Sequence, residues 1–262
     1  MAGLAQWTGQ GSDSGMKYVL SSWKMYPTLD QAQASFEAIQ RGLQERAQRG
    51  TVLPRVILCP PLLSLVPFAT LVDRRVLSLG AQNCHWKAEG PYTGEISPRM
   101  LQGLVDYVLV GHSERRAAGE TDEQVGWKVA AVAEHGLTPI LLVGEDDPGE
   151  DAILTSEQRL RHGLSGVDLS RQPVVVVYEP TWAIGTEETA STSHISRSVT
   201  YLKGVLADMG ATEPEILYGG SVNDDNVDAL ARLDVLDGVG AGRASLDPDQ
   251  FLRLIDQVAR SM

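Results

Sequence analysis

Glu179 is the residue of this chain best placed to act as a general base. It follows four consecutive valines at 174–177 and one tyrosine, and an unbroken β-branched run is typical of a strand buried on both faces. A carboxylate at the end of such a strand is costly unless it has a partner or a task. Pro180 biases Glu179 away from helix, and the apolar segment 182–185 could cover a ligand and exclude water. The sequence therefore predicts a base at a strand end beneath a closing segment.

Lys24 and His112 also follow apolar runs and could contact the same substrate. Lys24 lies between Trp23 and Met25, and a lysine there could stabilise charge that develops on a substrate oxygen. If a short helix begins at Ser113, its N-terminal dipole disfavours a charged His112 imidazole. A neutral imidazole can donate a hydrogen bond to a carbonyl or enediolate oxygen. A solvated lysine and a structural histidine are the simpler alternatives.

Other titratable groups near these positions leave more than one interpretation open. Glu114 could pair with Lys24 across the mouth of a barrel, or with its neighbours Arg115 and Arg116. Histidines that fall in predicted helices, or open one, are expected at the surface: His135, His162 and His194. His112 is thus the histidine that the strand pattern singles out.

Two glycine-rich turns could bind an oxyanion. Gly219 and Gly220 precede Ser221, and a second turn ends in Gly242 and Arg243 before a predicted helix. Glycines let the backbone approach an anion closely, and amides at a helix start point toward it. Two tight turns without a ligand are the alternative interpretation.

The apolar runs and amphipathic stretches alternate through eight strand–helix units. Strands are expected near residues 18–20, 56–59, 76–81, 107–110, 140–143, 174–178, 216–218 and 235–241. Helices are expected near residues 29–46, 62–71, 98–104, 121–135, 152–163, 192–209, 224–232 and 247–259. Eight such units in one domain of about 250 residues predict an α/β fold, a single-domain (β/α)8 TIM barrel over residues 16–262. An open doubly wound sheet is the alternative. In a barrel, all the candidate residues would meet at the carboxyl ends of the strands.

Composition narrows the class of protein further. The chain has 262 residues and a net charge of −12, which argues against nucleic acid or an anionic membrane as a partner. No apolar run approaches the ~20 residues of a membrane span. Cys59 and Cys84 have no metal-like spacing and no dinucleotide fingerprint is present, so we expect no metal and no cofactor. A cytoplasmic location is expected, and residues 1–15 are predicted to be a disordered N-terminal extension.

Over residues 17–260 the chain resembles the triosephosphate isomerase family. The matching segments fall in the family's order: Trp23-Lys24-Met25, Ala81-Gln82-Asn83, Thr93-Gly94-Glu95, Gly111-His112-Ser113-Glu114-Arg115-Arg116, Tyr178-Glu179-Pro180, Trp182-Ala183-Ile184-Gly185-Thr186 and Tyr218-Gly219-Gly220-Ser221. The resemblance implies interconversion of dihydroxyacetone phosphate and D-glyceraldehyde 3-phosphate, a step of glycolysis and gluconeogenesis. It also implies a small phosphorylated sugar as the partner molecule.

The resemblance assigns roles to these residues. Glu179 would move a proton between adjacent carbons, His112 would polarise the carbonyl, and Lys24, oriented by Glu114, would steady the enediolate. Substrate and phosphate would be bound by Lys24, Ser22, Gly185, Ser221, Gly242 and Arg243. A lid over residues 180–190 would be latched through Trp182, Ile184, Tyr218 and Ala190. The loop at 90–97, with Thr93 and Glu95, would reach into a second subunit, which implies a homodimer.

Four departures from the family pattern leave the substrate open, one of them being Leu142, where the family usually has a cysteine. The family usually has asparagine where this chain has Ser22, glycine where it has Arg243, and Gly-Lys where it has Glu187-Glu188. The Ser-Trp-Lys-Met form and Arg243 resemble relatives that isomerise a four-carbon phosphoketose such as L-erythrulose 1-phosphate. A non-catalytic barrel that binds sugar phosphates is a further alternative.

Overall fold

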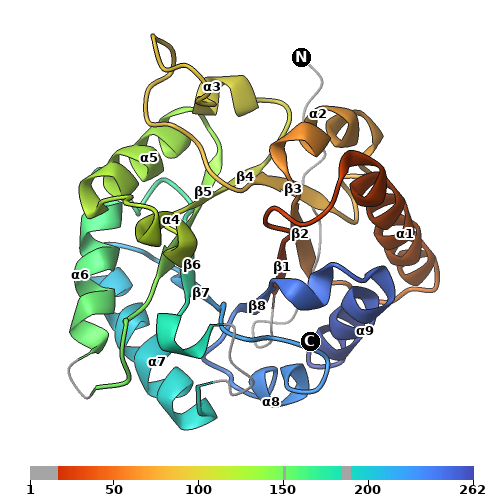
Figure 1. Cartoon of the computed structure of the whole chain (residues 1–262). Coiled ribbons are helices and arrows are strands. Elements are labelled where there is room, and N and C mark those ends of the chain that lie inside the picture. Colours follow the sequence, from red (N-terminus) through yellow and green to blue (C-terminus); the bar gives the residue numbers. More distant parts are fainter. Residues whose placement is uncertain (1–16, 150–151, 185–189) are drawn as a thin grey trace.

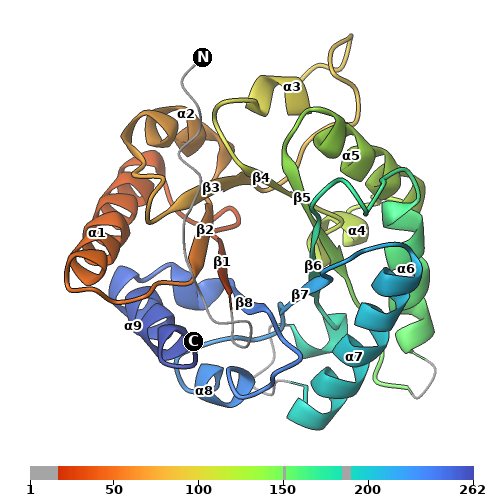
Figure 2. The same cartoon turned by 180° about the vertical axis from the view of Figure 1, so that it is seen from behind.

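The chain forms a closed barrel of eight parallel strands surrounded by helices, seen along its axis from either end in Figures 1 and 2. This computed structural model describes residues 17–149, 152–184 and 190–262. The strands are β1 (Tyr18–Ser22), β2 (Arg55–Cys59), β3 (Ser78–Ala81), β4 (Tyr107–Val110), β5 (Thr138–Val143), β6 (Val175–Tyr178), β7 (Glu215–Tyr218) and β8 (Gly238–Ala241). The predicted (β/α)8 barrel is confirmed. The expected extension over residues 1–15 lies outside the described residues.

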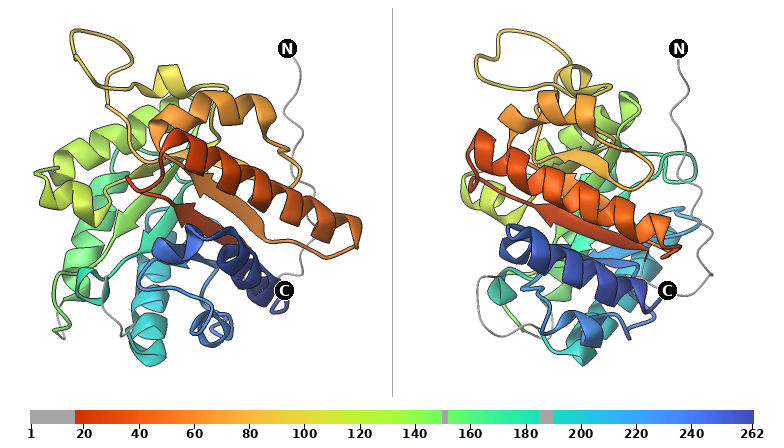
Figure 3. Two further views of the ribbon diagram at one scale, coloured as in Figure 1. Left: turned by 45° about the vertical axis from the view of Figure 1, so that its right-hand side comes forward. Right: turned by 90° about the vertical axis from the view of Figure 1, so that its right-hand side faces the viewer.

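The helices pack around the outside of the barrel. They are α1 (Leu29–Gln48), α2 (Leu62–Leu71), α3 (Pro98–Leu101), α4 (Ser113–Ala117), α5 (Asp122–Glu134), α6 (Ile153–Leu164), α7 (Thr192–Asp208), α8 (Val227–Leu230) and α9 (Pro248–Ala259). The 3-10 helices η1 (Thr181–Ala183) and η2 (Arg243–Ser245) follow β6 and β8. Figure 3 shows the segment between β3 and α3 projecting away from the barrel wall.

Each strand is apolar on both faces because it separates two cores. In β6, Val175 and Val177 point into the barrel interior with Leu20 and Leu142, while Val176 belongs to the layer between strands and helices. A strand buried on both sides cannot alternate polar with apolar residues. This explains the unbroken valine run and places the following Glu179 at the carboxyl end of the barrel.

Several predicted elements are longer in the sequence pattern than in the fold, among them the strand expected at 76–81 and the helix expected at 98–104. Two further cases have an identifiable cause. The last strand begins at Gly238 rather than at residue 235, because the chain turns before it: the Leu236 amide donates to the Leu233 carbonyl at 2.9 Å, and Asp237 lies in a bend. The helix expected over 224–232 is confined to α8, because the Asn223 side chain accepts the amide of Asn226 at 3.1 Å. Neither difference moves a candidate residue away from the strand ends.

Candidate active site

A cavity of about 380 Å³ opens at the carboxyl ends of the strands. It draws its walls from segments that are far apart in the sequence, because the barrel brings the strand ends together. Candidate residues that line it are Ser22, Lys24, His112, Glu179, Ile184, Ser221, Gly242 and Arg243. Gly185 lies outside the described residues, as does the Glu187-Glu188 pair.

Glu179 is a buried carboxylate held by the backbone on one side. Its amide donates to the Val143 carbonyl at 2.7 Å, and its Oε2 accepts the Ser113 amide at 3.3 Å. Gly144 passes so close that a Cβ on it would lie 1.9 Å from the Glu179 carbonyl oxygen. Burial raises the pKa of Glu179, and His112, the Ser113 amide and Lys24 only partly offset that effect. A carboxylate with a raised pKa is the stronger base once it is ionised.

The hydrogen bonds of His112 define its tautomer. The residue caps α4, and its Nδ1 accepts the Glu114 amide at 3.1 Å. An amide donor requires a lone pair on Nδ1, so the ring proton of the neutral imidazole sits on Nε2. Nε2 lies 3.4 Å from Oε1 of Glu179. The ring therefore presents an N–H donor to the cavity beside the candidate base.

Lys24 is fixed in an uncommon backbone conformation. Among the described residues it is the non-glycine residue with a positive φ, at 50°. Such conformations cluster at functional sites because the surrounding structure must hold them. Its Nζ lies 2.6 Å from Oε1 of Glu114, and its carbonyl accepts the Gln82 side chain at 3.0 Å. Burial raises the pKa of Glu114, but the Lys24 hydrogen bond together with the charge interactions with His112 and Lys24 outweighs burial, so the net pKa is lowered.

The pairing of Glu114 is thereby resolved. Arg116 binds Asp122 rather than Glu114, and Arg115 lies 3.9 Å from Glu120. Of the alternatives that the sequence left open, the structure contains the pair with Lys24.

Small residues line another part of the cavity wall. Ser221 donates its hydroxyl to the Ala183 carbonyl at 3.0 Å, and its own carbonyl accepts Asn226 at 2.7 Å. Gly242 precedes η2, where Arg243 is exposed and lines the cavity. These backbone groups and the guanidinium can hold an anion, since anions bind where amides and cations converge.

The candidate latch residues Trp182 and Ile184 flank Ala183, whose carbonyl accepts the Ser221 hydroxyl. Ile184 lines the cavity, and the Ala190 amide donates to the Tyr218 hydroxyl at 3.3 Å. The Trp182 indole lies 3.4 Å from Oε1 of Glu145.

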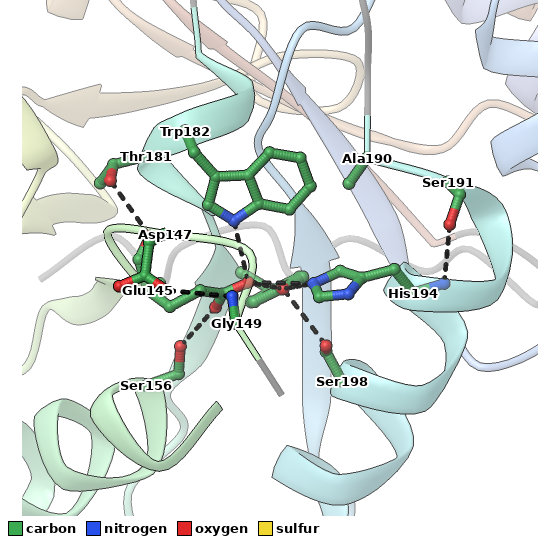
Figure 4. A network of polar contacts seen from close by, with 12 residues as sticks. Glu145, Asp147, Gly149, Ser156, Thr181, Trp182, Ala190, Ser191, His194 and Ser198 are labelled. Atoms are coloured by element: carbon green, nitrogen blue, oxygen red, sulfur yellow. Dashed lines mark hydrogen bonds and ion pairs between the residues drawn. The ribbon is translucent and has the colours of Figure 1, made fainter. Parts of the chain in front are cut away.

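His194 was predicted at the surface, and that prediction is wrong. Its side chain is 22% exposed, and its Nε2 lies 3.0 Å from Oε1 of Glu145 and 2.9 Å from the Tyr178 hydroxyl (Figure 4). The sequence gives no local signal for this contact, because Glu145 lies in a different strand–helix unit.

Thr93 and Glu95 lie apart from the cavity. Both are exposed in the projecting segment between β3 and α3 (Figure 3). Within the described ranges, no group of histidine, cysteine, aspartate and glutamate side chains could hold a metal ion. None of the helices in that part of the chain is long and apolar enough to cross a membrane.

The fold is a parallel (β/α)8 barrel, and Glu179, His112 and Lys24 line one cavity at the carboxyl ends of its strands. The family model for triosephosphate isomerase matches residues 17–258. The chain belongs to the triosephosphate isomerase family, as its sequence predicted.

Individual relatives agree along nearly their whole length. The chain is 40% identical over 243 residues to a triosephosphate isomerase of Trichodesmium erythraeum, covering 91% of this chain and 97% of that protein. It is 39% identical over 246 residues to one from Roseiflexus castenholzii, with 89% and 94% covered. A third, from Dehalococcoides mccartyi, is 38% identical over 249 residues, with 92% and 96% covered.

Proposed function

We propose that this chain interconverts dihydroxyacetone phosphate and D-glyceraldehyde 3-phosphate. The observation that carries the proposal is the convergence of Glu179, His112 and Lys24 on one cavity in a member of the triosephosphate isomerase family. The relatives compared above are all named triosephosphate isomerase. The two alternatives, a four-carbon phosphoketose isomerase and a non-catalytic sugar-phosphate barrel, have no support from these relatives.

In the proposed reaction, Glu179 removes a proton from C1 of the ketose. The electron pair of the broken C–H bond forms the C1–C2 double bond, and the carbonyl oxygen becomes the enediolate oxygen. His112 donates from Nε2 to that oxygen, and Lys24 adds a positive charge beside it, so charge is stabilised where it develops. Transfer of a proton from O1 to O2, followed by return of the Glu179 proton to C2, gives the aldose.

The substrate phosphate is assigned to the end of the cavity formed by Ser221, Gly242 and Arg243. Because the chain carries a net charge of −12, an anionic substrate depends on such local donors. Gly185 belongs to this proposal from the sequence alone. Ser22 is proposed to line the wall beside Lys24, and residues 182, 184, 190 and 218 to latch the lid.

A homodimer is the second part of the proposal. Support comes from large apolar side chains that are exposed in this single chain, among them Met25 (97%), Leu63 (80%) and Val66 (60%). Leu63 and Val66 both lie on α2, and an exposed apolar patch is typical of an interaction surface. The projecting loop with Thr93 and Glu95 would supply the contact to the second subunit. We also place the protein in the cytoplasm, since Cys59 and Cys84 are both free thiols.

The direct test follows the proton in heavy water. Dihydroxyacetone phosphate incubated with the protein in D2O should yield glyceraldehyde 3-phosphate carrying deuterium at C2, detected by proton NMR. Glu179→Gln should abolish both isomerisation and exchange, since the amide cannot accept the proton. Exchange that persists in Glu179→Gln would assign the base to another residue, and absence of turnover by the unaltered protein would refute the proposed function.

A further inference from the structure

The Glu145 carboxylate is the centre of a buried hydrogen-bond network that the proposed reaction does not use (Figure 4). The residue is 1% exposed and follows β5. Its Oε2 accepts the Ser156 hydroxyl at 2.8 Å, and its Oε1 accepts the Tyr178 hydroxyl. Burial raises the pKa of Glu145, but hydrogen bonds from Tyr178, Ser156 and His194 outweigh it, so the net pKa is lowered. Glu145 is therefore an ionised acceptor that depends on its donors.

His194, in α7, also reaches this carboxylate. Nε2 lies 3.0 Å from Oε1 of Glu145. An ionised carboxylate only accepts hydrogen bonds, so Nε2 carries a hydrogen. The backbone holds the ring in place, because the His194 amide donates to Ser191, the N-cap of α7, at 3.2 Å. The ring also packs edge-on against Trp182, with centroids 5.4 Å apart.

The same carboxylate oxygen faces the first residues after Glu179. The Trp182 indole lies 3.4 Å from Oε1 of Glu145, and the Thr181 amide donates to the Glu145 carbonyl at 2.9 Å. One residue further on, the Ala183 carbonyl accepts the Ser221 hydroxyl at 3.0 Å. A shift of Glu145 would therefore move η1 and, through it, Ser221, which lines the cavity.

We propose that His194 is a positioning residue for the active-site cavity. By donating a hydrogen bond to Glu145, His194 holds the carboxylate where it accepts a hydrogen bond from the Trp182 indole. The segment that carries Trp182 is then held in place, and with it the cavity wall formed by Ile184 and Ser221. His194 touches neither the cavity nor the substrate, and acts through Glu145 and Trp182. The inference rests on the proposed function for its catalytic consequence, but its effect on anion binding does not.

Two amide variants keep a hydrogen-bond donor at position 194 and differ in the length of the side chain. His194→Gln carries a donor on a chain long enough to approach Glu145, whereas His194→Asn has the same amide one methylene shorter. Ser198→Ala is the matched control: it removes a hydroxyl that lies 3.2 Å from the Tyr178 hydroxyl, one turn further along α7, without touching Glu145 or Trp182. All three variants disturb one network from one helix, so loss of stability alone should affect them similarly.

We expect His194→Asn to lower kcat/KM for dihydroxyacetone phosphate on the order of tenfold, since small misplacements of a site are costly. It should also weaken binding of inorganic phosphate, measured by competition or by tryptophan fluorescence. His194→Gln should restore most of both losses. Ser198→Ala should leave both within about twofold, whatever its effect on the melting temperature.

Three results would overturn the inference. Full activity and phosphate affinity in His194→Asn would show that His194 positions nothing. Equal losses in Ser198→Ala would show a general structural effect, and failure of His194→Gln to exceed His194→Asn would exclude the donor role. If the unaltered protein does not isomerise the triose phosphates, the proposed function fails, whereas the phosphate affinities still decide the role of His194.

Discussion

Nε2 of His112 and Oε1 of Glu179 lie 3.4 Å apart, and the other oxygen of Glu179 accepts the Ser113 amide at 3.3 Å. The base is therefore held at the start of α4 by the segment that also fixes the histidine tautomer. Burial outweighs these favourable contacts and raises the pKa of Glu179 above its ordinary 4.5. Keeping a carboxylate buried and ready to ionise has consequences for both activity and stability.

Glu179→Gln should stabilise the protein at neutral pH while it abolishes activity. Because the folded-state pKa is raised, this group contributes stability fully below its ordinary pKa, and that contribution is lost as pH rises through the raised value. The glutamine cannot ionise, so its advantage in melting temperature should be largest at pH 7–8 and shrink as pH falls toward the ordinary value of 4.5.

The same shift predicts the acid limb of the activity profile. The kcat/KM of the unaltered protein should fall with acid through an apparent pKa above 4.5, because Glu179 must be ionised to accept a proton.

Glu134→Gln, an exposed change on α5, is the control for the melting curves of Glu179→Gln. A lower melting temperature for Glu179→Gln at pH 8 would contradict the raised pKa.

Gly144→Ala should displace the backbone of Glu179 and lower activity. The added Cβ would lie 1.9 Å from the Glu179 carbonyl oxygen, so the backbone that carries the base must shift. We expect kcat to fall by roughly a hundredfold for a shift near 1 Å. Gly204→Ala in α7 meets nothing within 4 Å and should stabilise the helix by about 1 kcal/mol at unchanged kcat. Equal kcat values for both variants would show that the close contact does not position the base.

Arg243→Ala should weaken phosphate binding and keep the backbone amide in place. The guanidinium is exposed beside the cavity. Because hydrogen bonds to charged groups contribute more than those between neutral groups, we expect the inhibition constant of inorganic phosphate to increase roughly fivefold or more. The increase should diminish at high salt, where exposed charges are screened. Arg171→Ala, another exposed arginine, should change nothing. An unaltered inhibition constant in Arg243→Ala would place its side chain in solvent.

Sedimentation equilibrium should give about twice the 28.3 kDa of one chain. Leu63→Glu places a charge at an exposed apolar position of α2 and should shift the mass toward one chain, since a buried unpaired charge is costly at an interface. Leu154→Glu, at another exposed leucine on α6, should leave the mass unchanged. A single-chain mass for the unaltered protein would refute the homodimer.

The barrel could be predicted because its strands are buried on both faces and therefore appear as short apolar runs. The runs also placed Glu179, His112 and Lys24 at strand ends. The extra residues assigned to the last strand were wrong because Val235 and Leu236 are apolar but precede a bend at Asp237. Apolar composition alone does not distinguish such a turn from the strand that follows it.

The contacts between side chains could be predicted less well. The pair of Lys24 with Glu114 remained one of several options, because its members are 90 residues apart and Glu114 has arginine neighbours. His194 was misplaced for a similar reason, since its helical neighbours are polar and its partner Glu145 is 49 residues away. Such contacts can be identified only in the folded barrel, where segments that are distant in the sequence lie side by side.

The most direct test compares kcat/KM for D-glyceraldehyde 3-phosphate and L-erythrulose 1-phosphate on the same purified protein. The proposed function predicts a strong preference for the triose, with turnover lost in Glu179→Gln. A strong preference for the tetrulose would contradict it. Ser22 and Arg243, the two cavity residues that depart from the family pattern, would then be the first candidates for determinants of specificity.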